Sequence, residues 1–172
     1  RGRTMSGRGS NWLLDKVYEA GVKTIIDLRT ADQTDRYYHN VMEAGMESLS
    51  IPIDSKATDV HQIIASLPRL FELMDRGNFF MACAMGRHRT DIAIALYYVF
   101  HPTVPVEAVP EMKGHRNVER NEFRYDDIAA RLNSVMKSMT IEERDMLGLD
   151  AGYETEFKCR KKHLFEVNSV FR

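Results

Sequence analysis

Hydrophobic residues follow two patterns along the chain. Short apolar runs alternate with segments of helical spacing in the first half, and the second half shows helical spacing. The β-branched run at 23–28 and the very short apolar run at 79–82 are typical of buried strands. The alternating segment 48–53 contains Pro52, which favours a strand near its end or at the edge of a sheet. Helical spacing and capping residues predict helices at 10–21, 33–44, 60–76, 90–100, 124–139 and 154–171, and a capping box at 140–143 predicts one more short helix.

Two of these helices bear directly on the architecture. Residues 90–100 are apolar almost all round, as expected of a central helix that is buried on every side. Residues 60–76 contain Pro68, which should kink the helix or divide it. Because strands alternate with helices in the first half and the second half is helical, we expect an α/β fold: a small central sheet flanked by helices, with a helical C-terminal extension.

Composition and charge narrow the class of protein. A chain of 172 residues, 44% hydrophobic and 28% charged, is expected to form a globular domain. Its 24 basic and 25 acidic side chains give a net charge of −1, so we do not expect nucleic-acid binding. No apolar run reaches the ~18 residues of a membrane span. The two cysteines, Cys83 and Cys159, exclude a disulfide framework and suit a reducing compartment such as the cytoplasm.

The loop between the second buried strand and the central helix carries the candidate chemistry. This loop, residues 83–89, runs into a helix N-terminus, where unpaired backbone N–H groups and the helix dipole favour an anion such as phosphate. Gly86 allows a tight backbone, and the planar guanidinium of Arg89 can bind two phosphate oxygens. Cys83 lies at the strand end beside the same groups, which favour the nucleophilic thiolate. The loop therefore predicts a phosphate site with a cysteine nucleophile.

The sequence of this loop resembles a known family signature. Residues 83–90, CAMGRHRT, resemble the C-x2-G-x2-R-[ST] signature of the cysteine-dependent protein tyrosine and dual-specificity phosphatases. Residues 21–29, GVKTIIDLR, resemble the GIKTVINLR strand of the atypical dual-specificity group, and residues 6–8 resemble its RSGRP segment. The run IPID at 51–54 is similar to the strand that leads into the general-acid loop, and GRHRT is similar to the GKHRT of the plant and fungal atypical members. The resemblance spans about Met5 to Phe100.

This resemblance implies a two-step phosphatase mechanism that needs neither a metal nor an organic cofactor. Cys83 would attack phosphorus and form a phosphocysteine. Arg89 and the backbone N–H groups of the loop would hold the equatorial phosphate oxygens. Thr90 would hydrogen-bond the sulfur and ease its departure in the second step. The loop residues expected to bind the substrate are Ala84, Met85, Gly86, Arg87 and His88.

The general acid of this mechanism is an aspartate that protonates the leaving oxygen and then activates water. The resemblance places it on the loop after the strand at 48–53, and that loop contains Asp54 and Asp59. We favour Asp54, because Asp59 directly precedes the helix at 60–76 and suits its N-cap.

Two positions depart from the family pattern. Ala82 replaces the histidine that usually precedes the cysteine and orders hydrogen bonds around the loop. Asp91 replaces the glycine that usually follows the threonine, and its carboxylate would lie near a bound dianion. These changes keep one alternative open, a catalytically weak or inactive phosphate-binding pseudophosphatase. Another C-x5-R enzyme, such as an arsenate reductase, is disfavoured because the resolving cysteines it needs are absent.

The charge of the loop bears on the substrate. Arg87 and His88 add positive charge within it, and Arg8, Arg29 and Arg116 are candidates to add more around it. Several cations at one site favour a ligand with several phosphates. The plant and fungal members that the signature resembles act on inositol phosphates. We therefore expect a phosphorylated partner, either an inositol phosphate or a protein carrying phosphotyrosine, phosphoserine or phosphothreonine.

The division of the chain follows from the helical pattern and the resemblance together. Residues 1–139 are expected to form the phosphatase-like catalytic domain, and residues 140–172 a helical extension packed on the same domain. The basic run KCRKKH at 158–163 is typical of a solvated helix face.

Overall fold

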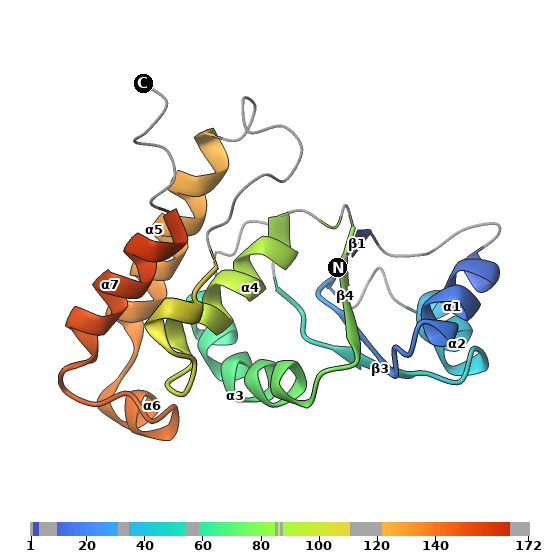
Figure 1. Cartoon of the computed structure of the whole chain (residues 1–172), viewed down its shortest axis with the longest axis horizontal. Helices are drawn as coiled ribbons and strands as arrows, with labels where there is room; N and C mark the ends of the chain where they lie inside the picture. The colour runs from blue at the N-terminus through green and yellow to red at the C-terminus, as the bar shows by residue number, and fades with distance from the viewer. Residues whose placement is uncertain are drawn as a thin grey trace.

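The computed structural model describes residues 2–3, 10–30, 35–53, 59–84, 86, 88–110 and 122–165. Its strands are β1 (Gly2–Arg3), β2 (Thr24–Asp27), β3 (Glu47–Ser50) and β4 (Phe79–Cys83). Its helices are α1 (Ser10–Glu19), α2 (Asp35–Glu43), α3 (Val60–Arg76), α4 (His88–Phe100), α5 (Glu122–Ser138), α6 (Ile141–Met146) and α7 (Tyr153–Phe165), with the 3-10 helix η2 (Val106–Ala108). Helices surround a small sheet and dominate the second half of the chain, so the predicted α/β fold is confirmed (Figure 1).

The sheet is parallel throughout and has the strand order β1-β4-β2-β3. β2 is central and its four residues are all buried, whereas β3 lies at the edge, as Pro52 just after it predicts. Asp27 at the end of β2 is in register with Ala82 near the end of β4. The carboxyl ends of these two strands therefore meet at one edge of the sheet, where ligands bind in open parallel α/β sheets.

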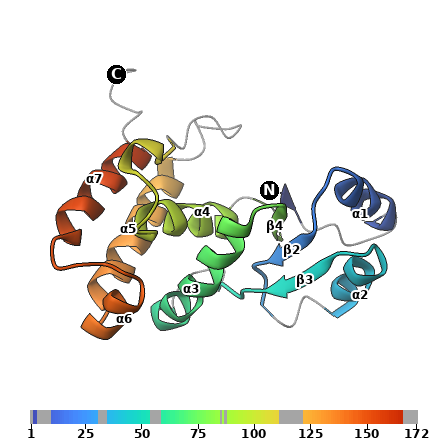
Figure 2. The same cartoon turned by 60° about the horizontal axis from the view of Figure 1, so that its bottom comes forward.

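Helices cover both faces of the sheet, and alternate residues of β2 point to opposite sides. Ile25 belongs to a small apolar cluster with α1, α2 and the turn before β3, through Leu14, Val41 and Met46. Ile26 belongs to a large cluster that takes in α3, α4, α5 and α7. The figures show α1 and α2 on one side of the strands and the remaining helices on the other (Figures 1 and 2).

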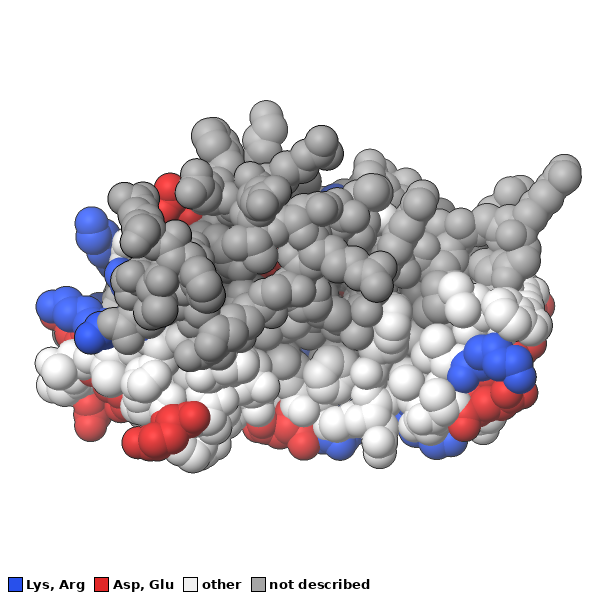
Figure 3. All heavy atoms as spheres, turned by 45° about the horizontal axis from the view of Figure 1, so that its top comes forward, with Lys and Arg blue, Asp and Glu red and all other residues white. Residues whose placement is uncertain are grey.

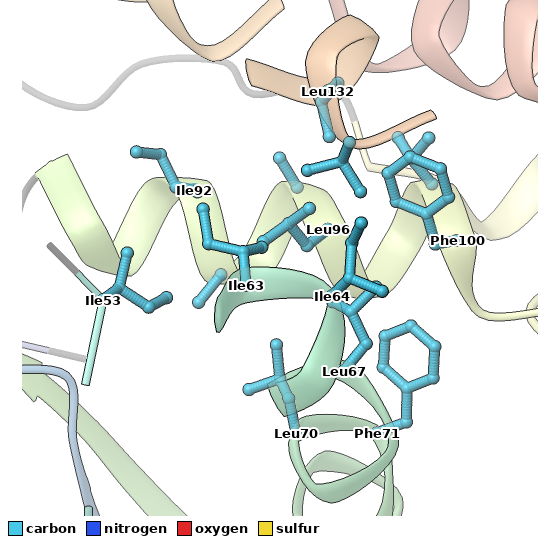
Figure 4. Close-up of a cluster of buried hydrophobic side chains, with 14 of the residues drawn as sticks. Ile53, Ile63, Ile64, Leu67, Leu70, Phe71, Ile92, Leu96, Phe100 and Leu132 are labelled. Carbon is cyan, nitrogen blue, oxygen red and sulfur yellow. The ribbon is translucent and has the colours of Figure 1, made fainter. Parts of the chain in front are cut away.

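Helix α4 is the centre of the large cluster, as its uniformly apolar sequence predicts. Ile92, Leu96 and Phe100 of α4 pack against residues of α3, and Leu132 of α5 closes the cluster from the opposite side (Figure 4). Packing of α4 against other elements places its N-terminus beside the carboxyl end of β4.

Pro68 does not divide α3, which runs without interruption from Val60 to Arg76. The expected division is wrong because packing on both sides of the proline outweighs the hydrogen bond it removes. Ile64 and Leu67 before it and Phe71 after it are buried in the same cluster. The apolar stripe is continuous across Pro68, and this keeps the helix in one piece.

Two helix starts predicted from capping residues are confirmed. The Asp59 side chain accepts a hydrogen bond of 3.0 Å from the backbone N–H of Gln62 and caps α3. Thr140 and Glu143 form a reciprocal capping box that opens α6. The last helix is described as far as Phe165, so the remainder of the predicted 154–171 helix lies outside the described residues.

Helix α7 is fastened to the C-terminal end of α4 by polar side chains in an apolar setting. The hydroxyl of Tyr153 donates to the carbonyl oxygen of Val99, and burial raises the pKa of this tyrosine above its ordinary value. Arg160, 1% exposed, donates from Nη1 to the carbonyl oxygens of Tyr98 at 3.1 Å and His101 at 3.0 Å. The bonds to Val99 and Tyr98 satisfy carbonyls in the last turn of α4, which have no partner within the helix.

Replacing Arg160 by methionine is expected to lower the free energy of unfolding by about 2–4 kcal/mol. The variant keeps the buried aliphatic volume but removes charged donors from the end of α4 and from Glu156, whose carboxylate accepts from Arg160 Nε at 2.8 Å. Urea unfolding measures the change. The matched control is Lys158→Met at an exposed position of the same helix, with an expected effect of ~0.5 kcal/mol or less. Equal stabilities for the two variants would refute the capping role.

Candidate active site

The candidate nucleophile lies where β4 ends and the loop to α4 begins. Cys83 is the last residue of β4 and is 3% exposed. The hydroxyl of Thr90, in the first turn of α4, donates to the sulfur of Cys83 over 3.2 Å. Thr90 itself is fully buried, so its hydroxyl is held in place by packing. The sulfur therefore lies beside the positive end of a helix dipole, with a hydroxyl donor directed at it.

The loop turns back on itself immediately after Cys83. The backbone N–H of Gly86 donates to the carbonyl oxygen of Cys83 at 3.3 Å, and Gly86 has a φ of 62°. This left-handed conformation is costly for residues with a Cβ, which explains the need for glycine here. Ala84 is half-buried in the same turn. Met85 and Arg87 lie outside the described residues.

Arg89 ties the start of α4 to the end of the central strand. It is 8% exposed, and its Nη1 donates to the carbonyl oxygen of Leu28 over 3.3 Å. The same carbonyl accepts the backbone N–H of Ile53 at 3.2 Å. Leu28 thus joins three segments at one point: the end of β2, the start of α4, and the extended chain that follows β3.

A buried ion pair lies at the same end of the sheet. Asp27, 0% exposed, faces Arg29, 5% exposed, and Nη2 of the arginine lies 2.7 Å from Oδ2 of the aspartate. Nε of Arg29 also donates to both carboxylate oxygens, at 3.0 and 3.1 Å. The positive charge of Arg29 is therefore balanced within the fold, and Arg29 adds no net charge to a phosphate site.

His88, the first residue of α4, is in contact with a carboxylate from α5. Its Nε2 lies 2.7 Å from Oδ2 of Asp127, and Oδ1 of Asp127 lies 3.6 Å from Nε of Arg131. Asp127 could not be found from the sequence, because no local pattern connects it to a residue 39 positions earlier in the chain. The pairing of Asp27 with Arg29 could have been predicted, since side chains two positions apart at a strand end point to the same side.

Several residues singled out from the sequence fall elsewhere. Asp54, Arg8 and Arg116 lie outside the described residues, whereas Asp59 is exposed and serves as the cap of α3. The two positions that depart from the family pattern are both buried, Ala82 within β4 and Asp91 in the first turn of α4. Within its described part, the structure therefore gathers Cys83, Ala84, Gly86, His88, Arg89 and Thr90 at one junction.

Charged side chains of both signs lie on the face of the molecule that Figure 3 shows. Lys and Arg side chains are interspersed with Asp and Glu on the described part of the face in Figure 3. Among the described residues, no three His, Cys, Asp or Glu side chains are grouped so as to hold a metal ion. No described helix is both long enough and apolar enough to span a membrane.

The junction of β4 and α4 lies within the part of the chain that is similar to a known family. No curated protein matches the chain. A family model described as "DSP-PTPase phosphatase fused to NAD+ Kinase" matches residues 1–131, which contain all four strands and the whole β4–α4 loop. With most of its length matched, the chain belongs to this family of dual-specificity-type phosphatase domains.

Proposed function

We propose that the protein is a phosphomonoesterase that acts through a phosphocysteine formed on Cys83. The observation that carries this proposal is the hydrogen bond from Thr90 to the sulfur of Cys83 at the N-terminus of a buried helix. A structural cysteine needs no hydroxyl donor and no helix dipole, whereas a thiolate nucleophile is stabilised by both. The GRHRT run favours the plant and fungal atypical group within the superfamily.

Each step of the reaction has a residue to perform it. The Cys83 thiolate attacks phosphorus while the ester oxygen leaves and takes a proton from Asp54. Arg89 and backbone N–H groups of the loop stabilise the charge on the three equatorial oxygens. Asp54 then removes a proton from water, which attacks phosphorus and releases the sulfur. The Thr90 hydroxyl stabilises the departing thiolate, and inorganic phosphate is released.

Hydrolysis of an aryl phosphate tests this function directly. The protein should release inorganic phosphate from 4-nitrophenyl phosphate without added metal. Acid quenching during turnover should trap a phosphoryl group on the peptide that contains Cys83, and mass spectrometry of the digest detects it. Turnover that needs a divalent metal and leaves Cys83 unmodified would contradict the proposal.

The alternative is a pseudophosphatase that binds phosphate without hydrolysing its esters. Ala82 and Asp91 motivate it, since one removes an ordering histidine and the other places a carboxylate in the first turn of α4. Phosphate binding without release of 4-nitrophenol would favour this alternative.

For the substrate, we propose a ligand with several phosphates, such as an inositol polyphosphate. Arg87 and His88 support this, because each further charge-assisted contact adds roughly 1.5–3 kcal/mol to binding. The family description also joins the phosphatase to an NAD+ kinase, an enzyme that makes a phosphate monoester on a dinucleotide. The phosphorylated dinucleotide is therefore the second candidate substrate.

An inositol polyphosphate is expected to be hydrolysed with a higher kcat/KM than a phosphotyrosine peptide. The preference should decrease at high salt, because the outer contacts are screened. It should also decrease in Arg87→Ala, while hydrolysis of 4-nitrophenyl phosphate is retained. A phosphate-release assay measures kcat/KM for the inositol polyphosphate, the phosphotyrosine peptide and 4-nitrophenyl phosphate. A phosphotyrosine peptide preferred by about tenfold at low salt, a difference of ~1.4 kcal/mol, would reject the polyphosphate assignment.

We further propose that residues 1–139 form the catalytic domain and residues 140–172 a helical extension packed on it. The bonds from Tyr153 and Arg160 to the end of α4 support such packing. A nucleophile that must stay a thiol also favours a reducing compartment such as the cytoplasm.

A further inference from the structure

Asp127 reaches the phosphate loop from a distant part of the chain. Its Oδ2 lies 2.7 Å from Nε2 of His88, joining α5 to the first residue of α4. Each of the two side chains is 33% exposed, so the contact is partly shielded from water and still open to a ligand. His88 directly precedes Arg89, the residue proposed to bind the phosphate oxygens.

We propose that Asp127 is a positioning residue for phosphate binding and that it acts through His88; the inference rests on the proposed phosphatase function. An ionised carboxylate can only accept hydrogen bonds, so Nε2 of His88 must carry the hydrogen in this contact. Nδ1 is then the ring nitrogen available to a ligand, and it donates to a phosphate oxygen when the ring is protonated. Asp127 fixes the orientation of the ring and hence the place of that donor.

The surroundings of Asp127 support positioning over simple attachment of α5. Helices α4 and α5 already pack through buried apolar residues, among them Ile128, 2% exposed, and Leu132, 0% exposed. The helices therefore do not need a polar contact to stay together. Arg131 lies 3.6 Å from the other carboxylate oxygen of Asp127 and offsets its charge. A carboxylate balanced in this way can hold His88 without strongly repelling a bound phosphate dianion.

The first test compares Asp127→Ala with Asp126→Ala, a change of the neighbouring exposed aspartate on the same helix. Asp127→Ala should raise the Kd of inorganic phosphate and the KM for 4-nitrophenyl phosphate about tenfold, or 1.4 kcal/mol, with kcat within about twofold. Asp126→Ala should leave both constants within about twofold. Asp127→Asn should fall between them, because an amide oxygen still accepts from Nε2 but carries no charge.

The second test asks whether Asp127 acts through His88. In His88→Ala, the further change Asp127→Ala should have almost no effect on phosphate affinity, so the two changes are strongly non-additive. Nitrogen-15 spectra of the imidazole in the absence of phosphate should show His88 with its hydrogen on Nε2 in the wild type and in Asp126→Ala. In Asp127→Ala, the imidazole of His88 should no longer be held in the single tautomer with its hydrogen on Nε2.

The outcomes separate this inference from the proposed function. The inference is wrong if the wild type hydrolyses 4-nitrophenyl phosphate but Asp127→Ala and Asp127→Asn bind phosphate as tightly as Asp126→Ala. The proposed phosphatase function is unaffected by that result. The inference is also wrong if Asp127→Ala lowers phosphate affinity equally in the wild type and in His88→Ala. A wild type that binds phosphate but hydrolyses nothing overturns the phosphatase, and the phosphate affinities alone then decide the role of Asp127. Circular dichroism confirms that each variant is folded, and Asp127→Asn replaces Asp127→Ala if the latter is not.

Discussion

Replacing Cys83 by serine is expected to abolish turnover of 4-nitrophenyl phosphate while phosphate binding is retained. At neutral pH a serine hydroxyl is a far weaker nucleophile than a thiolate, so kcat should fall by at least about 10³-fold. The anion site persists, because Arg89, the backbone N–H groups of the loop and the N-terminus of α4 are unchanged. Steady-state kinetics and titration with inorganic phosphate measure the two effects separately.

The control for this experiment is Cys159→Ser. Cys159 is an exposed free cysteine on α7, in a helix that packs against the far end of α4, so its replacement should leave kcat within about twofold. A serine variant at Cys83 that hydrolyses the substrate at a rate near the wild type would rule out the phosphocysteine. A folded Cys83→Ser that no longer binds phosphate would show that the sulfur itself holds the anion.

Elements that depend on local pattern were predicted well from the sequence. The uniformly apolar run at 90–100 becomes the central helix α4, and the capping box at Thr140 opens α6. Features that depend on contacts between residues far apart in the sequence were not predicted. The division of α3 at Pro68 is wrong because the free energy gained by packing α3 outweighs one lost hydrogen bond. The strand β1 has only two residues, Gly2 and Arg3, and its pairing with β4 leaves no periodic signal in the sequence.

The residues of the candidate site also differ in whether they could be predicted from the sequence. The group at the β4–α4 junction could be proposed from the sequence because Cys83, Gly86, Arg89 and Thr90 lie in one continuous run. The loop geometry follows from local physics, a positive φ at Gly86 and a helix N-terminus after it. The catalytic roles of these residues stay predictions. Asp127 could not be found in this way, because only the packing of α5 on α4 brings it to the loop.

The described residues Ile53 and Asp59 bear on the choice between the two candidate aspartates as general acid. Ile53, which precedes Asp54 in the sequence, donates its N–H to the carbonyl of Leu28, the same carbonyl that accepts from Arg89. The chain therefore passes close to Arg89 immediately before Asp54. Asp59 instead accepts from the N–H of Gln62 and caps α3. Asp59 therefore already has a structural role as the cap of α3, which leaves Asp54 as the favoured candidate for the acid.

Replacing Asp54 by asparagine is expected to lower kcat for an alkyl phosphate about 10²–10⁴-fold, the usual contribution of general acid–base catalysis. The loss should be smaller for 4-nitrophenyl phosphate, whose leaving group needs little protonation. Activity of the wild type should fall at high pH, as the acid loses its proton, and Asp54→Asn should lack this fall. The control is Asp59→Asn, because asparagine caps a helix about as well as aspartate and so keeps α3 intact. A large loss of kcat with a flattened pH profile in Asp59→Asn, and neither in Asp54→Asn, would transfer the role of general acid to Asp59.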